Sequence, residues 1–222
     1  MRINKYIASC GVMSRRGCEM SITNGRVRVN GKVVTDLSTQ INDRDIVELN
    51  GKVIKPVTDK IYLVMNKPRG YVTSCYDDRG RKIVMDLLPE DMRGKHIFPV
   101  GRLDYDTEGL LILTNDGDFA QGLIHPKFKV QKVYVATVDQ EVTPQHIKDL
   151  SIQADRVTKT GDKVIEIIIH TGLNRQVRKM IADVGLETVN LKRVAIGDLV
   201  LRDLKVGHWR AFSLQDTKLG LR

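Results

Sequence analysis

The sequence predicts an α+β fold built from two unequal parts. In the larger part, strand-like apolar runs outnumber helix-like stretches, and the two kinds do not alternate regularly, which argues against a doubly wound parallel sheet. The chain of 222 residues is long enough to bury a core without disulfide or metal staples. Apolar residues at 41% and charged residues at 28% are typical of a globular protein.

The first 35 residues predict two short helices followed by a hairpin. Apolar side chains recur at helical spacing between Ile3 and Cys10, and Gly11 follows as a stop signal. Ser14 is a suitable N-cap for a second helix. Asn30-Gly31, between alternating segments, predicts a two-residue hairpin turn.

A second Asn-Gly pair at 50–51 extends this module, and the proline-containing segment 55–59 predicts a linker. We therefore expect domains at 1–57 and 58–222. In the second domain we expect strands at 61–65, 97–100, 110–113, 132–138, 164–169 and 195–201. Helices are expected there at 118–124, 143–150 and 174–184.

The charge balance favours a polyanionic partner. Lys and Arg number 36 against 27 Asp and Glu, which gives a net charge of +9. No apolar run is long enough to span a bilayer and no signal peptide precedes the first helix, so we expect a cytoplasmic protein without membrane contact. The three cysteines form no CxxC and the five histidines are scattered, so no metal site is expected.

The N-terminal segment resembles an S4-like RNA-binding domain. The resemblance rests on Arg2-Ile3-Asn4-Lys5-Tyr6-Ile7, Ser14-Arg15-Arg16 and Gly25-Arg26-Val27-Arg28-Val29-Asn30-Gly31. In that family the basic face of the helix pair and the following strand bind RNA. The resemblance implies a small α/β domain whose RNA contacts are Lys5, Arg15, Arg16, Arg26 and Arg28.

The remainder resembles ribosomal RNA pseudouridine synthases of the RsuA/RluB/RluF type. The matching segments, in order, are Asn66-Lys67-Pro68-Arg69-Gly70, Gly101-Arg102-Leu103-Asp104 with Thr107-Glu108-Gly109-Leu110-Leu111, Lys132-Val133-Tyr134, Asn174-Arg175-Gln176-Val177-Arg178-Lys179-Met180 and Gly207-His208-Trp209-Arg210. The acids at 104–108 also partly mimic a calcium loop, but its twelfth position is Asn115 instead of glutamate. The family implies a mixed, largely antiparallel sheet.

The resemblance implies isomerisation of a uridine with no cofactor. Asp104 is expected to be the catalytic carboxylate, which either attacks the sugar C1′ or removes a C2′ proton. Arg178 is expected to lie against it and keep it ionised, and Tyr134 to stack on the target base. Arg102 is expected to fill the space that the flipped base leaves, while Lys67, Arg69 and Arg175 line the RNA path.

The expected partner is ribosomal RNA, free or in an assembling particle, with the large subunit favoured. Two alternatives stay open. The same chemistry could act on the small subunit, or the scaffold could serve a binding protein without activity. A monomer is expected, because the sequence has no heptad pattern or apolar stripe.

Overall fold

The computed structural model describes residues 1–219 and divides into two compact units. The N-terminal unit comprises Met1–Ile61 with two further segments, Glu90–Ile97 and Asn115–Gly117. The larger unit comprises Tyr62–Pro89, Phe98–Thr114 and the described chain from Asp118 onward. Each unit has its own sheet.

The N-terminal unit begins with the two expected helices. Its elements are α1 (Ile3–Ser9), α2 (Arg15–Thr23), β1 (Val27–Val29), β2 (Lys32–Val34), β3 (Val47–Leu49), β4 (Lys52–Val53) and α3 (Glu90–Arg93). Ser14 caps α2 as predicted, because its hydroxyl accepts a hydrogen bond of 3.2 Å from the Gly17 amide. Gly11, at φ +66°, follows the end of α1.

Both Asn-Gly pairs form the predicted hairpins. Asn30 and Gly31 have φ values of 51° and 78°, and Asn50 and Gly51 have 51° and 77°, as type I′ turns require. The four strands are antiparallel in the order β2–β1–β3–β4. The apolar faces of the helices and strands form the core of this unit, which includes Ile3, Ile7, Cys18, Ile22, Val27 and Val47.

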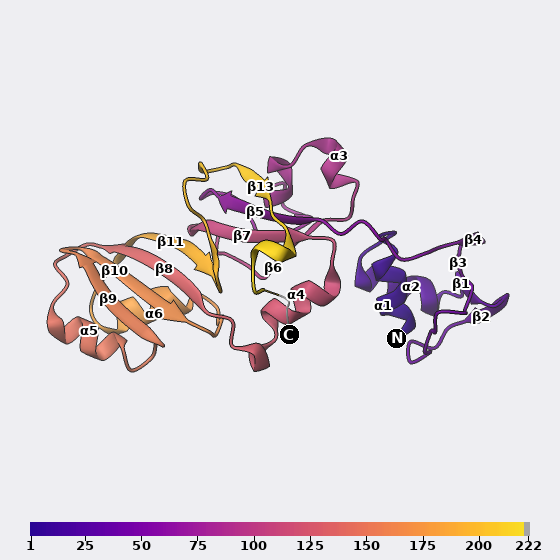
Figure 1. Cartoon of the computed structure of the whole chain (residues 1–222), viewed down its shortest axis with the longest axis horizontal. Coiled ribbons are helices and arrows are strands. Elements are labelled where there is room, and N and C mark those ends of the chain that lie inside the picture. The colour runs from indigo at the N-terminus through magenta and orange to yellow at the C-terminus, as the bar shows by residue number, and fades with distance from the viewer. Residues whose placement is uncertain (220–222) are drawn as a thin grey trace. The chain divides into compact units, whose positions relative to one another are not determined.

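The larger unit is a nine-stranded sheet with helices against it (Figure 1). Its strands are β5 (Tyr62–Lys67), β6 (Phe98–Val100), β7 (Glu108–Thr114), β8 (Lys132–Val138), β9 (Arg156–Gly161), β10 (Val164–Ile169), β11 (Thr188–Ile196), β12 (Leu199–Val200) and β13 (Trp209–Ala211). Its α-helices are α4 (Gly117–Ile124), α5 (Pro144–Leu150) and α6 (Gln176–Asp183). Short 3₁₀ helices occur at Val84–Leu87, Pro126–Phe128 and Leu214–Asp216.

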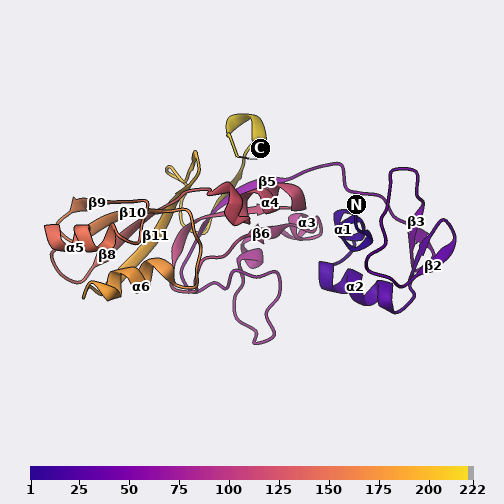
Figure 2. The ribbon, with the colours of Figure 1, turned by 90° about the horizontal axis from the view of Figure 1, so that it is seen from below.

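The sheet is mixed and largely antiparallel, as expected. Its order is β13–β5–β7–β11–β8–β10–β9, with β12 paired to β11 and β6 paired to β7. Among the named strands of the described chain, β7 and β11 form the only parallel pair, which aligns Lys192 with Glu108 and Arg193 with Gly109. Helix α6 lies along one face of the β8–β11 region (Figure 2).

Strands β8 and β10 have the predicted bounds, but the predicted strand at 195–201 is wrong. Gly197, at φ +56°, turns the chain there, so that Ile196 in β11 pairs with Leu199 in β12. Strands β9 and β13 were not predicted, because their short sequences have little apolar alternation. No helix in the described part of the chain combines the length and apolar character that a membrane crossing needs.

Candidate active site

A cavity of about 500 Å³ lies in the larger unit, where the segment after β6 meets β8, β11 and the loop before α6. Its lining includes Arg102 and Asp104 from one of the predicted motifs and Tyr134 from another. Arg175 also lines it, from the start of α6. The fold therefore gathers residues from three of the motifs at one concave site.

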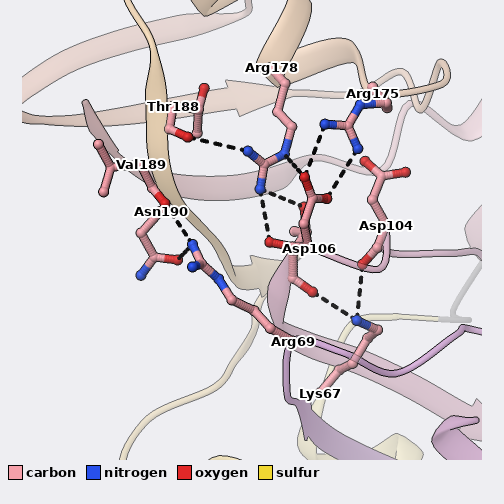
Figure 3. A network of polar contacts seen from close by, with 10 residues as sticks. Lys67, Arg69, Asp104, Asp106, Arg175, Arg178, Thr188, Val189 and Asn190 are labelled. Carbon is pink, nitrogen blue, oxygen red and sulfur yellow. Dashed lines mark hydrogen bonds and ion pairs between the residues drawn. The ribbon is translucent and has the colours of Figure 1, made fainter. Parts of the chain in front are cut away.

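Lys67, the last residue of β5, forms hydrogen bonds to the backbone of the loop that carries Asp104. The Lys67 ammonium donates to the backbone carbonyls of Pro68, Asp104 and Thr107 at 3.0, 3.0 and 2.9 Å. The Thr107 amide in turn donates to the Asp104 carbonyl at 3.1 Å. Lys67 is fully buried, so it does not line an RNA path as expected but fixes the backbone of the loop (Figure 3).

Replacing Lys67 with methionine is expected to lower the free energy of unfolding by about 3 kcal/mol, because three carbonyls that are buried or partly buried lose their donor. Urea unfolding measures the change. Lys205→Met is the matched control, since Lys205 is exposed. Equal stability of the two variants would contradict the structural role of Lys67.

Stability should also depend on pH through this residue. Burial lowers the pKa of Lys67 from 10.5 to about 8, although the nearby acids oppose that shift. Between these values the unfolded chain binds more protons than the folded chain, so stability rises with pH. The stability gap between the wild type and Lys67→Met should therefore widen from pH 8 to pH 10.5.

Two arginines at the start of α6 converge on Asp106 (Figure 3). Arg175 donates two hydrogen bonds to its carboxylate, at 3.1 and 3.0 Å, and Arg178 forms an ion pair at 3.4 Å. Burial raises the pKa of Asp106, but the Arg175 hydrogen bonds and the Arg178 charge outweigh burial and lower it overall.

Arg178 was expected to lie against Asp104, and the structure pairs it with Asp106 instead. Its guanidinium also donates to the Asp106 carbonyl at 2.8 Å. Arg178 therefore contacts the same loop, two residues after Asp104. Within residues 1–219 no ion pair joins the Asp104 carboxylate to another side chain. The cavity therefore holds a carboxylate that is free to act on a substrate.

Tyr134 lies on β8, with its side chain almost fully buried at the cavity wall. It aligns with Ile167 of β10 on one side and with Arg193 of β11 on the other. Arg193 donates to the Tyr134 hydroxyl at 3.4 Å, and its guanidinium carbon lies 6.0 Å from the centre of the ring. The apolar ring is thus fixed beside a cation.

The other predicted RNA contacts are all exposed. Arg102 is exposed at the cavity, and Arg69 donates to the Val189 carbonyl at 2.8 Å and to the Asn190 side chain. In the N-terminal unit the five predicted contacts, Lys5, Arg15, Arg16, Arg26 and Arg28, are all exposed. Among the described residues no cluster of three or more His, Cys, Asp or Glu side chains could hold a metal ion.

Sequence reasoning missed Arg193, although the sequence contained a signal for it. Leu191, Arg193 and Ala195 alternate along β11, and all three are buried. A strand period of two thus predicts a basic residue on the core face. Asp106 was recognised only as part of the acidic turn, since its partners lie about 70 positions away.

Comparisons with known proteins identify the family of this chain. A family model described as RNA pseudouridylate synthase matches residues 61–183, and an S4 domain model matches residues 1–47. The chain is 39% identical to ribosomal large subunit pseudouridine synthase B of Bacillus subtilis, over 98% of this chain and 94% of that relative. It is 34% identical to the dual-specificity RNA pseudouridine synthase RluF of Escherichia coli, over 95% and 74%. A pseudouridylate synthase crystal structure superimposes with a TM-score of 0.70 and 27% identity over 97% of each chain.

Proposed function

Because the chain belongs to the family of RNA pseudouridylate synthases and carries an S4 domain, we propose that it isomerises a uridine of large-subunit ribosomal RNA with Asp104 as the catalytic carboxylate. The observation that carries the proposal is the cavity, which both Asp104 and Tyr134 line. The large-subunit target is supported by the name and 39% identity of the Bacillus subtilis relative. We infer a monomer that acts in the cytoplasm without a cofactor.

The reaction moves the glycosidic bond of the nucleotide from N1 to C5 of uracil. The bond between N1 and C1′ breaks, the base turns, and C5 bonds to C1′ while the C5 proton leaves and N1 gains a proton. Asp104 starts this sequence either by attacking C1′ or by taking the C2′ proton. Tyr134 offers the detached base a flat apolar face.

Arg178 acts in this proposal as a positioning residue. With Arg175 it holds Asp106 and the loop backbone, and this loop also carries Asp104. Arg102 is exposed at the cavity, where it can fill the space of the extruded base. Arg69 and Arg175 extend the positive charge at the site toward RNA phosphates.

The exposed basic residues of the N-terminal unit are proposed to bind RNA through phosphates. The double variant Arg15→Gln/Arg16→Gln should weaken RNA binding and reduce the slope of log affinity against log salt by about 1.5, since each phosphate contact contributes about 0.7–0.9. Filter binding across a salt series measures both. The rate at saturating RNA should stay at the wild-type value, and an unchanged slope would contradict the assignment.

The function is tested by tritium release from C5-tritiated uridine in large- and small-subunit transcripts and in partly assembled particles. Release from a large-subunit substrate alone is the expected result. Release from the small-subunit substrate would support the proposed reaction but assign its target to the small subunit. Binding without release from any substrate would favour the alternative of a binding protein.

A further inference from the structure

Arg193 is a buried cation without a matching negative charge. Only 3% of its surface is exposed, and its Nε donates to the Leu110 carbonyl at 2.8 Å. One terminal nitrogen, Nη2, has no hydrogen-bond partner among the described residues, and no ion pair within them includes this side chain. An uncompensated buried charge costs several kcal/mol, so its retention beside a reaction cavity points to a function.

Lys132 is a further cation in the cavity wall, and backbone carbonyls of the protein satisfy it. Lys132 donates to the carbonyls of Val130, His170 and Thr171 at 3.1, 3.2 and 3.3 Å. Asp104, by contrast, has a carboxylate that no described side chain pairs. Within the described chain, the cavity wall therefore presents to a substrate a carboxylate outside any ion pair, on Asp104, and a buried guanidinium with an unpartnered nitrogen, on Arg193.

We propose that the Arg193 guanidinium binds the carbonyl oxygens of the target uracil and stabilises the negative charge on the base while it is detached. The inference rests on the proposed function. When the N1–C1′ bond breaks, its electron pair stays with uracil, and the charge spreads over N1 and the two carbonyl oxygens. The sugar becomes correspondingly electron-poor. A carboxylate for the sugar and a guanidinium for the base match this separation of charge.

The backbone holds Arg193 in place before a substrate arrives. Its peptide units lie against Gly109 of β7, where a methyl group would overlap them. Its side chain is tied to Leu110 in β7 and to Tyr134 in β8. A fixed donor needs little reorganisation during the reaction, which is the condition for strong electrostatic stabilisation.

The first test is the single-turnover rate of Arg193→Gln, which should fall by about 100-fold, as for loss of one donor to a developing anion. Arg193→Lys keeps the charge and should lose less. RNA affinity and its salt dependence should match the wild type, because the residue is assigned to the base and not to a phosphate. Thermal unfolding of both variants shows whether they are folded.

The second test uses RNA with 5-fluorouridine at the target, since fluorine makes uracil a better leaving group. Loss of the starting nucleoside, measured by chromatography after nuclease digestion, reports cleavage. The deficit of Arg193→Gln should shrink from about 100-fold with uridine to about tenfold with 5-fluorouridine. Lys132→Gln is the matched control, and its deficit should be equal on the two substrates.

The outcomes separate the inference from the function on which it rests. An inactive wild-type protein would contradict the proposed function itself. With an active wild type, equal deficits of Arg193→Gln on both substrates would overturn the inference and leave a structural role. A weaker affinity with a smaller salt slope would also overturn it, in favour of a phosphate contact.

Discussion

Asp104→Asn is expected to reduce tritium release by about 10⁴-fold or to background, the upper end of what a positioned proton-transfer group contributes. The amide keeps the shape of the side chain but loses the negative charge that both attack at C1′ and proton removal require. RNA affinity should stay close to the wild type, because carboxylates repel phosphates and contribute no binding energy. Rate and affinity are measured on the same transcript.

Asp106→Asn provides the comparison for this result. Asp104 has no paired side chain among the described residues, so its substitution should leave the unfolding temperature nearly unchanged. Asp106 accepts from Arg175 and pairs with Arg178, so its substitution should lower that temperature and reduce activity only in part. Full activity of Asp104→Asn would show that another group performs the chemistry.

Gly109→Ala is expected to destabilise the protein by about 4 kcal/mol or to prevent folding, as overpacking and backbone strain combine. An added Cβ would overlap the Arg193 carbonyl oxygen and lie 2.6 Å from the Arg193 nitrogen. These are backbone atoms of a paired strand and cannot turn aside. Gly109 also has φ +111°, which an L-amino acid rarely adopts.

Gly122→Ala is the matched control, because it makes the same chemical change within helix α4. Apart from the neighbouring residues and backbone of its own helix, no described atom lies within 4 Å of the added Cβ. Alanine also favours a helix by about 1 kcal/mol over glycine. Urea unfolding should thus show a lower free energy of unfolding for Gly109→Ala and a higher one for Gly122→Ala. A Gly109→Ala protein as stable as the wild type would contradict the close approach of β7 and β11.

The elements that follow local rules were predictable from the sequence. The Ser14 cap and the turn at Asn30-Gly31 depend on residues only a few positions apart. Strands β8 and β10 were predicted with their bounds because alternation and β-branched residues are local signals. The turn at Gly197 was missed because one strand was expected across the apolar residues on both sides of Gly197-Asp198, although this pair is itself a hairpin signal.

The arrangement of the site was less predictable, since it depends on contacts between distant segments. Lys67 was expected to line the RNA path from a turn beside Pro68, yet it is buried. Its amine donates to the Pro68 carbonyl and to two carbonyls of the loop that carries Asp104. The partner of Arg178 was expected at 104 and lies at 106, a difference decided by how the loop meets α6. The spacing of the motif residues alone does not indicate which of these two carboxylates pairs with Arg178.

Along the path of strands from β13 to β9, the parallel contact between β7 and β11 aligns the fewest residues. Only Lys192 with Glu108 and Arg193 with Gly109 are aligned across it, whereas β5 pairs with β7 along its whole length. The Asp104 loop belongs to the side of β7, and Tyr134 and Arg193 belong to the other side. The distance between the Asp104 carboxylate and the side chains of Tyr134 and Arg193 therefore depends on a strand pairing that aligns only two residues on each side.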